Sequence, residues 1–363
     1  MAVAVPVYAY LGYPVVLLLF GLVRGRPVTK RAVTPAISLL IPAYNEGDVI
    51  ARKIENSLAL DYPADALEIV IASDGSTDQT VEIAQSVGGD RVRVLAFPEN
   101  RGKVAILNAS VPELRGEVIV FSDAPATLEP GSVRKLVENF GDPTVGAVSG
   151  LYKVVKPDQV NIGASEDFYW KYETFLKVQE SRLGSTLGGH GHLHAIRKTL
   201  YPFPPPGTIN DDYVIPVSVL ARGYRAVYEP SAIVYEEARE MTGFGRRVRI
   251  MAGNIQQLRE IKGLLRPIRP LEVLFFLSHK VCRLLVPFAM LAALILNSLL
   301  LESQFYAGLF SAQIAFYVLA AAGTVWRLRP RPLMLPFYFC MINLATFFGF
   351  YHALTHRRRM AWE

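Results

Sequence analysis

Val118-Ile119-Val120-Phe121-Ser122-Asp123-Ala124-Pro125 is the stretch that decides the fold of this chain. Its apolar residues, rich in β-branched side chains, predict a buried strand of a parallel sheet that stops at an acid. The carboxyl ends of the strands form the ligand crevice of an open α/β sheet. A carboxylate at that place can hold a divalent ion, which in turn can hold a diphosphate. We therefore expect Asp123 to lie in a ligand crevice, with Pro125 where a second ligand could stand.

Alternating strand and helix patterns surround this stretch, from Ala36 to about Leu265. Short apolar runs that end in polar loops predict strands, and amphipathic runs between them predict helices. The first strands that we expect are residues 37–41, 67–72, 92–97, 117–122 and 145–149. This alternation predicts a doubly wound, mostly parallel α/β sheet.

The rest of this region carries longer helical patterns. We expect an aromatic-rich helix at 166–182, an apolar helix at 213–220, short strands at 225–228 and 232–235, and a basic helix at 244–260. The basic helix contains Arg246, Arg247 and Arg249. Guanidinium groups in such a row suit a diphosphate, and they equally suit anionic lipid headgroups.

Both ends of the chain are strongly apolar, which raises the hydrophobic fraction to 51% and the mean hydropathy to +0.26. Residues 2–23 contain no charged side chain and are long enough to cross a bilayer. Basic residues follow this run, at Arg24 and Arg26, whereas a cleaved signal peptide carries them before it. We therefore expect an uncleaved anchor with Arg24 onward in the cytoplasm, a buried core helix being the alternative.

Three apolar spans are expected near the C-terminus, at residues 284–301, 305–326 and 333–354. The run at 271–283 before them is interrupted by charged residues and histidine, which is typical of a helix in the membrane interface. The topology of the last span stays open, because a full crossing would leave three arginines outside. The expected organisation is an N-terminal transmembrane helix at 1–24, a cytoplasmic domain at 35–265, an interface helix at 266–283 and a transmembrane region at 284–356.

Charge and cysteine content exclude several classes of protein. The net charge of +6 is modest, and much of the basic excess stands beside apolar spans, where membrane headgroups explain it. No motif for DNA or RNA binding is present. The two cysteines, Cys282 and Cys340, both lie in the apolar C-terminal part, so a disulfide framework or a zinc site is excluded. The composition favours a multi-pass protein of the cell membrane.

Six short motifs follow one another along this pattern. They are Ile-Pro-Ala-Tyr-Asn-Glu at 41–46, Ser-Asp-Gly-Ser-Thr-Asp at 73–78, Asn-Arg-Gly-Lys at 100–103, Phe-Ser-Asp-Ala at 121–124, Asp-Asp at 211–212 and the arginines at 246–250. In this order the motifs resemble the inverting family 2 glycosyltransferases, above all the membrane-embedded branch that contains hyaluronan, chitin-oligosaccharide and cellulose synthases. The resemblance covers about 36–265.

This resemblance implies a GT-A, Rossmann-like fold and a reaction. The expected reaction moves a sugar from a nucleoside-diphosphate sugar, for which we expect UDP, to a hydroxyl of a saccharide or lipid-linked acceptor. It also implies Mg²⁺ or Mn²⁺ as cofactor, held by Asp123. The donor-binding residues that it implies are Pro42, Ala43, Tyr44, Asn45, Glu46, Asp74, Lys103, Asp123, Ala124, Arg246 and Arg249. Each has a plainer alternative, such as a capping acid for Asp74 or a solvated lysine for Lys103.

The acid pair Asp211-Asp212 is the expected catalytic site. An inverting transfer needs one carboxylate to take the proton of the attacking hydroxyl. By position in the family motif, Asp212 is the candidate base and Asp211 its neighbour. The alternative is a pair of N-cap residues ahead of the helix at 213–220.

The chain departs from the family pattern at two positions. Pro125 stands where the family usually has a second acid or asparagine, so the cation shell needs other ligands. Ile250 stands where the family has a tryptophan that would stack under an acceptor sugar, which puts long processive synthesis in doubt. His190, His192 and His194 alternate after two glycines. They are expected to line the acceptor pocket, and one of them could instead complete the metal shell.

Two rival functions remain open from the sequence. The first is a non-processive transferase that adds one sugar to a lipid carrier. The second is a catalytically weak subunit that only binds a nucleotide sugar, as Pro125 and Ile250 could suggest. The sequence does not identify the sugar, the linkage, the acceptor or the oligomeric state.

Overall fold

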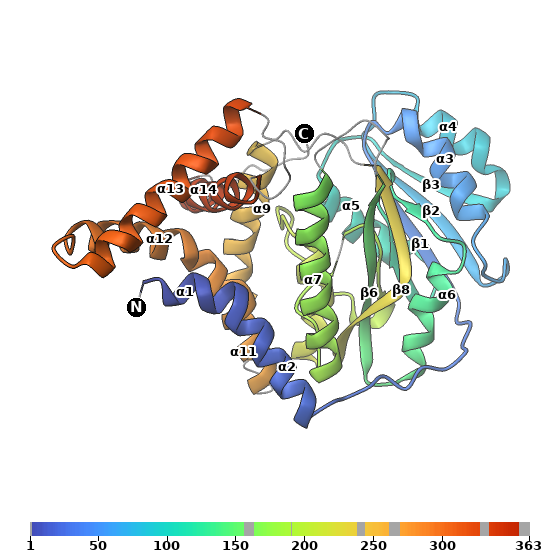
Figure 1. Ribbon diagram of the computed structural model, residues 1–363. Helices are drawn as coiled ribbons and strands as arrows, with labels where there is room; N and C mark the ends of the chain where they lie inside the picture. Colours follow the sequence, from blue (N-terminus) through green and yellow to red (C-terminus); the bar gives the residue numbers. More distant parts are fainter. Residues whose placement is uncertain are drawn as a thin grey trace.

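An eight-stranded sheet forms the centre of the larger part of the chain (Figure 1). The computed structural model describes residues 2–155, 163–189, 191–237, 244–260, 269–326 and 334–355. The strands stand in the order β3-β2-β1-β4-β7-β6-β8-β5. They are β1 (Ile37–Ala43), β2 (Leu67–Asp74), β3 (Val92–Phe97), β4 (Val118–Phe121), β5 (Thr127–Leu128), β6 (Val145–Val155), β7 (His194–Arg197) and β8 (Arg225–Glu237).

Strand β4 lies in the middle of this sheet and is buried on both faces, as its sequence predicts. It pairs in parallel with β1 and antiparallel with β7. Val118 and Val120 belong to one hydrophobic core, while Ile119 and Phe121 belong to the core on the opposite face. The alternation of a strand therefore places one half of this apolar run in each core.

Helices cover both faces of the sheet. The helices α3 (Gly47–Leu58), α4 (Thr80–Gly88) and α6 (Ser132–Val137) pack on one core. The helices α5 (Lys103–Ser110), α7 (Gly163–Leu183) and α8 (Asp211–Ala221) pack on the other. Short turns of 3₁₀ helix follow several elements: η2 (Gly89–Arg91), η3 (Val111–Glu113), η4 (Glu138–Gly141), η5 (Lys198–Leu200) and η6 (Gln257–Glu260). The doubly wound, mostly parallel architecture is confirmed, with antiparallel β5 and β7 added to it.

Some boundaries differ from the sequence predictions. The two short strands expected at 225–228 and 232–235 form one strand, β8, which pairs with an equally extended β6. A register shift in that pairing, between Gly150 and Leu151, absorbs the interruption near Pro230. Helix α8 begins at Asp211 itself, so the acid pair forms its first turn instead of preceding it. The expected basic helix is α9 (Phe244–Gln256), continued by η6.

Four helices in the described part of the chain are long and apolar enough to cross a membrane, by length and composition. The first, at Ala4–Val23, consists of α1 (Ala4–Val7), η1 (Tyr8–Gly12) and α2 (Tyr13–Val23). The second runs without interruption from Pro270 to Ser298, as α11 (Pro270–Phe275), η7 (Phe276–Val281) and α12 (Cys282–Ser298). The last two are α13 (Gln304–Trp326) and α14 (Met334–Thr355).

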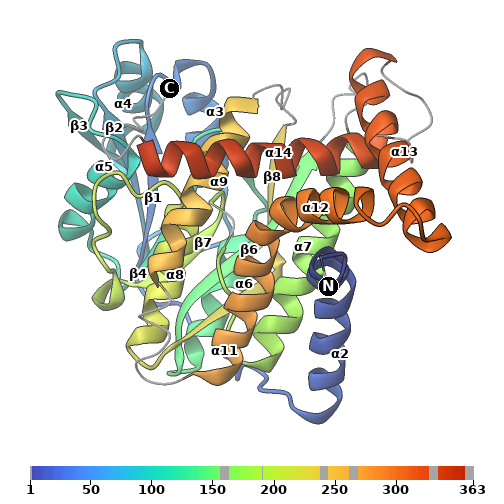
Figure 2. The same cartoon turned by 90° about the vertical axis from the view of Figure 1, so that its left-hand side faces the viewer.

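The run at 271–283 and the apolar span after it form one continuous helix, because the backbone stays helical through Cys282. The π-helical turn η7 instead bends the helix, so that α11 and α12 run in different directions (Figure 2). Whether the first half lies in the membrane interface stays a prediction.

Helix α7 joins the sheet to the apolar helices (Figure 1). The Tyr13 hydroxyl of α2 donates a 2.7 Å hydrogen bond to Glu180 of α7. On the same helix, Glu173 contacts Arg283 of α12, and His279 of η7 stands between the two glutamates, 2.6 Å from Glu180 and 3.2 Å from Glu173. These buried contacts join the apolar helices to the domain.

Helix α14 crosses α9 at a glycine (Figure 2). A Cβ atom on Gly349 would lie 2.7 Å from the Cβ atom of Met251 and 3.0 Å from the backbone nitrogen of Ala252. No real Cβ atom approaches so closely, so the contact needs a residue without a side chain. The crossing fixes the position of α9, which carries Arg249 and Ile250.

We predict that Gly349→Ala lowers the midpoint of thermal unfolding in detergent, because the two helices must separate. Overpacking of this kind costs about 1–3 kcal/mol. The matched control is Gly308→Ala on α13, where an added Cβ atom meets nothing within 4 Å. There we expect no loss, since alanine is the better helix former. Equal midpoints for both variants would show that the crossing at Gly349 is not tight.

Candidate active site

Lys103 connects two carboxylates at the carboxyl ends of the parallel strands. Its ammonium lies 2.9 Å from Asp123, just after β4, and 3.2 Å from Asp211, in the first turn of α8. The sequence predicted all three residues as site residues, and the structure brings them together. The structure also shows a contact that no motif indicated: the Lys103 side chain connects the end of the central strand β4 to the start of α8.

The electrostatics of this bridge favour the charged forms of its members. Burial opposes ionisation of Asp123, but Lys103 and His192 outweigh it and hold the pKa of the Asp123 carboxyl well below its usual range. Burial likewise disfavours the Lys103 ammonium, but Asp123 and Asp211 raise the pKa of Lys103 above its ordinary value. Asp123 and Lys103 are therefore both charged at neutral pH.

Asp74 positions the loop that carries Lys103. Its fully buried carboxylate accepts hydrogen bonds from the backbone N–H groups of Arg101, at 2.7 Å, and Gly102, at 2.8 Å. Gly102 has a φ of +87°, a conformation that favours glycine. Helix α5 starts directly after it, at Lys103. The donor-pocket role of Asp74 stays a prediction, and the structure shows that its carboxylate holds this loop.

The loop after β1 is held by the loop after β2. The Asn45 side chain accepts a 2.9 Å hydrogen bond from the backbone N–H of Thr77, and the backbone N–H of Glu46 donates to Thr80 at 2.8 Å. Asp78 accepts from the backbone N–H groups of Thr80 and Gly47, so it links the starts of α4 and α3. The predicted donor residues at 42–46 form the end of β1 and the loop after it, with Pro42 and Ala43 buried.

The loop after β4 is fixed from behind by a buried lysine. The Lys53 ammonium donates to the Ser122 hydroxyl at 2.7 Å and to the Ala126 carbonyl at 2.6 Å. Burial lowers the pKa of Lys53 to about 7. Ala124 is buried between these two contacts, and Asp123 faces the crevice. Sequence reasoning missed Lys53, because a lysine on an amphipathic helix ordinarily faces water.

His192 is the histidine that reaches the bridge. Its Nδ1 atom lies 3.1 Å from Asp123 and its Nε2 atom 3.3 Å from Glu236 on β8. The ring stacks on Tyr152, with centroids 4.4 Å apart. His194, by contrast, is buried in the core and stacks on Phe121, and His190 lies outside the described residues.

A divalent cation fits the corner between Asp123 and His192. The Nδ1 atom of His192 is buried and makes no hydrogen bond, although the Asp123 carboxylate is its neighbour. A carboxylate oxygen beside such a nitrogen is a donor pair that a divalent ion can bridge. Among the residues that the structure describes, no group of three His, Cys, Asp or Glu side chains could hold a metal ion. Phosphate oxygens or water would therefore supply the remaining ligands.

Asp212 stands beside this corner, against a glycine loop. Its backbone carbonyl accepts a 2.8 Å hydrogen bond from Gly189. A Cβ atom on Gly191 would lie 3.6 Å from the Cβ atom of Asp212 and 3.7 Å from Asp123 Oδ2, so the loop runs between the two acids. Burial and the neighbouring Asp211 raise the pKa of the Asp212 carboxyl. A buried carboxylate with a raised pKa is suited to take up a proton.

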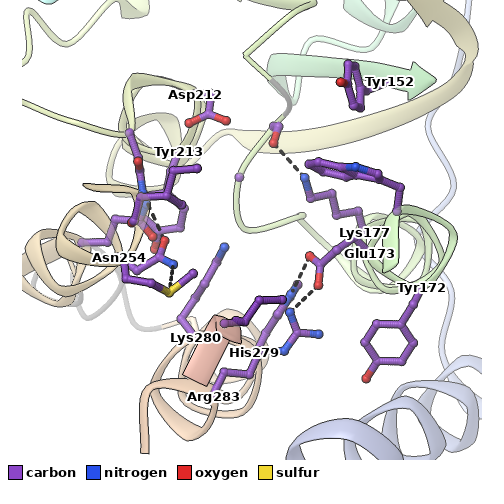
Figure 3. A pocket seen from close by; sticks show the side chains of 18 of the residues that line it. Tyr152, Tyr172, Glu173, Lys177, Asp212, Tyr213, Asn254, His279, Lys280 and Arg283 are labelled. Carbon is purple, nitrogen blue, oxygen red and sulfur yellow. Dashed lines mark hydrogen bonds and ion pairs between the residues drawn. The ribbon is translucent and has the colours of Figure 1, made fainter. Parts of the chain in front are cut away.

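One cavity of about 900 Å³ extends from these acids to the apolar helices (Figure 3). Asp123, Asp212 and Arg249 line it, as do Tyr10 from η1, Lys280 from η7 and Phe339 from α14. Of the two predicted arginines, Arg249 thus reaches the cavity, while the Arg246 side chain lies outside the described residues. Ile250 also lines the cavity, at the place where the resemblance implied an aromatic residue.

Several lining residues were not predicted from the sequence. They come from α7, β6, β8 and η7: Tyr152, Trp170, Glu173, Lys177, Glu236 and Lys280. Helix α7 was predicted with an aromatic stripe, but its charged residues carried no motif. Lys280 was noted only as an interruption of an apolar run. Only the packing of α7 against η7 brings these charges into the cavity.

Comparisons with known proteins agree with this geometry. Residues 38–202 match the family model of glycosyl transferase family 2. A poly-beta-1,6-N-acetyl-D-glucosamine synthase of Staphylococcus aureus (strain MSSA476) is 27% identical over 249 residues, which are 66% of this chain and 60% of that protein. An N-acetylglucosaminyltransferase of Rhizobium leguminosarum bv. viciae is 26% identical over 215 residues, 55% of this chain and 50% of that protein. The chain thus spans only part of the length of these curated relatives.

A solved structure resembles the whole chain. The mannosyltransferase PcManGT from Pyrobaculum calidifontis, in complex with GDP-Man and Mn²⁺, superposes with a TM-score of 0.72. The match covers 98% of this chain and 99% of that chain, at 23% sequence identity. The likeness confirms the GT-A fold together with the apolar helices at both ends.

We predict that Asp74→Ala lowers the midpoint of thermal unfolding and displaces Lys103. The variant leaves two part-buried N–H groups without their carboxylate acceptor, and each such loss costs up to about 1–3 kcal/mol. The matched control is Asp61→Ala, which removes an exposed ion pair with Arg134. Exposed pairs contribute little to stability. A stability loss no larger in Asp74→Ala than in Asp61→Ala would contradict the assigned role of Asp74.

Proposed function

We propose that this chain, whose residues 38–202 match the family model of glycosyl transferase family 2, is an inverting glycosyltransferase of the cell membrane. It moves a sugar from a nucleoside-diphosphate sugar to a hydroxyl of a lipid-linked acceptor. One observation carries the proposal: a single cavity connects the Lys103–Asp123 corner and Asp212 with the apolar helices. The catalytic domain at 35–265 faces the cytoplasm, where nucleotide sugars are made.

The donor lies at the carboxyl ends of β1, β2 and β4. Residues 42–46 and Asp74 line the nucleoside end, and Lys103, Ala124 and Arg249 surround the diphosphate. We retain UDP as the first choice for the nucleotide. The solved mannosyltransferase binds GDP-Man, which supports a nucleoside-diphosphate sugar and makes GDP the alternative.

A divalent cation, Mg²⁺ or Mn²⁺, completes the diphosphate corner. The Mn²⁺ in the solved mannosyltransferase supports this, as does the fit between Asp123 and His192. When bound, the cation stabilises negative charge on the leaving diphosphate as a Lewis acid. Lys103 and Arg249 add fixed positive charge on the same side.

Asp212 acts as the general base. The acceptor oxygen attacks the anomeric carbon while the bond from that carbon to the diphosphate oxygen breaks, and the bonding electron pair leaves with the diphosphate. The proton of the acceptor hydroxyl passes to the Asp212 carboxylate. Attack from the face opposite the leaving group inverts the anomeric centre. Asp211 holds Lys103 in place and raises the proton affinity of Asp212.

The acceptor approaches from the membrane side of the cavity. Tyr10, Leu284 and Phe339 belong to helices long enough to span a bilayer, and they line that side. An apolar wall suits a lipid chain better than a polar glycan. Ile250 adds to this argument, because it offers no aromatic platform for a growing saccharide. Addition of one or a few sugars to a lipid therefore fits better than processive synthesis.

The function is tested by measuring nucleotide release from purified full-length protein with a panel of UDP- and GDP-sugars, with and without Mg²⁺ or Mn²⁺. We expect release with one donor class and dependence on the cation. Donor binding without release for any sugar would contradict the proposal and favour a nucleotide-sugar-binding subunit. If the protein responds to the cation but binds none of the donors, the proposal is likewise contradicted.

We predict that Asp123→Ala abolishes transfer, since it removes the ligand for the cation and the partner of Lys103. Pro125→Asp, which restores an acid where the family usually has one, should leave transfer intact and at most tighten cation binding. Calorimetric titration of Mn²⁺ in the presence of nucleoside diphosphate measures the binding directly. Full activity of Asp123→Ala would show that the diphosphate corner is misassigned.

We predict that His192→Ala weakens Mn²⁺ binding and raises the cation concentration needed for half-maximal transfer by about tenfold or more. His194→Ala is the matched control, because that ring packs in the core against Phe121 and reaches neither acid. It should lower the unfolding midpoint and leave the cation requirement unchanged. An unchanged cation requirement in His192→Ala would exclude His192 as a ligand.

We predict a fall of kcat/KM toward acid pH that begins above the pKa of about 3.9 of an ordinary aspartate. The base must be ionised to accept a proton, and the pKa of Asp212 is raised, so acid inactivates it early. Asp212→Asn should lower kcat by about 10²–10⁴-fold. Asp211→Asn should act through Lys103 and mainly raise KM for the donor. If Asp211→Asn lowered kcat more than Asp212→Asn does, the assignment of Asp212 as the base and Asp211 as its neighbour would be reversed.

A further inference from the structure

The membrane side of the cavity contains charged side chains that an apolar chain alone would not need. Glu173 and Lys177 of α7 are buried there, beside the half-buried Lys280 of η7 and Arg283 of α12 (Figure 3). Buried charges are costly unless they are paired. The partners of these groups therefore decide what the cavity can bind.

The acidic groups are matched. Glu173 contacts Arg283 and His279, and Glu180 accepts hydrogen bonds from Tyr13 and contacts His279. The His279 ring lies between the two glutamates, with Nδ1 2.6 Å from Glu180 and Nε2 3.2 Å from Glu173. Both carboxylates therefore have close partners in Arg283, His279 and Tyr13.

The two lysines are left without such a match. The Lys177 ammonium donates a 2.7 Å hydrogen bond to the carbonyl of Gly189, and the Lys280 ammonium lies 5.2 Å from the centroid of the Tyr213 ring. In the part of the chain that the structure describes, neither lysine lies within 4.0 Å of a carboxylate oxygen. Both are side chains of the cavity wall, and both point toward the space in front of Asp212 (Figure 3).

Lys177 and Lys280 line the same cavity. Burial lowers the pKa of Lys177 to about 8 and Lys280 adds to the lowering, while Glu173, Asp212 and Glu180 oppose it. Two ammonium groups on the wall of one cavity form a site for an anion. The anion must be reached from the membrane side, because Leu11 and Val15 of the first apolar helix line the same cavity and are exposed.

We propose that Lys280 and Lys177 bind a phosphate group of the acceptor lipid. The inference rests on the proposed function and names its acceptor class: a lipid with a phosphate in its headgroup and a free hydroxyl beyond it. The phosphate lies between the two ammonium groups, the acyl or prenyl chain runs along the apolar helices, and the hydroxyl reaches Asp212. Lys280 comes from the same continuous helix as the apolar wall, so headgroup and chain are bound by one element.

Binding of short lipids tests this site. The full-length protein in detergent is titrated by calorimetry with dihexanoyl phosphatidic acid, with dihexanoylglycerol and with inorganic phosphate. We expect phosphatidic acid to bind at least about tenfold more tightly than either of the others, because only it engages both the lysines and the apolar wall. Equal affinity for the two lipids would overturn the proposal. Phosphate binding as tight as that of phosphatidic acid would overturn its lipid part.

Variants locate the site. Lys280→Gln and Lys177→Gln should each weaken phosphatidic acid binding about tenfold and leave dihexanoylglycerol binding unchanged. Lys280→Arg should restore most of the affinity, since it keeps the charge. Lys135→Gln on α6 is the matched control, because this half-exposed lysine pairs with Glu138 away from the cavity. Wild-type affinity in Lys280→Gln would contradict the assignment.

The same preparations separate this inference from the proposed function. Among the described residues, Lys280 forms no ion pair with Asp123, the acid of the diphosphate corner, so Lys280→Gln should bind nucleoside diphosphate as the wild type does. If the wild type binds no nucleoside diphosphate, the proposed function fails, whatever the lipids do. If it binds nucleoside diphosphate and shows no preference for phosphatidic acid, only the anionic acceptor is excluded.

Discussion

The ionic bridge from Asp123 through Lys103 to Asp211 is the constraint on which the rest of the site depends. It joins the end of a central strand, the start of α5 and the first turn of α8. Every other part of the site supports one of its members: Asp74 fixes the loop before Lys103, and Lys53 fixes the loop around Asp123. A donor diphosphate would therefore meet a charge pattern that is already in place, which lowers the cost of reorganisation during transfer.

A second constraint ties this site to the membrane. Helix α7 carries Glu173 and Glu180, which meet the apolar helices through Tyr13, His279 and Arg283. From the same helix, Lys177 bonds to the glycine loop that packs on Asp212. Any shift of the membrane helices would thus reach the proposed base through one rigid element. This arrangement suits an enzyme whose acceptor stays in the bilayer while its donor comes from water.

The sequence was informative where local chemistry decides the structure. The apolar run before Asp123 predicted a buried strand, and the motif order predicted the GT-A fold, because each depends on residues adjacent in the chain. It was uninformative where distant segments meet. Nothing near Lys53 or Lys177 indicates that its ammonium is buried, and the start of α8 at Asp211 depends on packing against the glycine loop. The role of His192 followed from neither spacing nor motif, since three alternating histidines looked alike until the sheet separated His194 from the cavity.

In the mechanism that we propose, one cavity brings a nucleotide sugar and a membrane lipid together at Asp212. The most direct test uses full-length protein in lipid nanodiscs, a donor labelled in its sugar, and extraction of the products into chloroform and methanol. We expect the label to move into the organic phase as a lipid with one or a few added sugars, identified by mass spectrometry. Label that stays in the aqueous phase, as free sugar or as a long polymer, would contradict it.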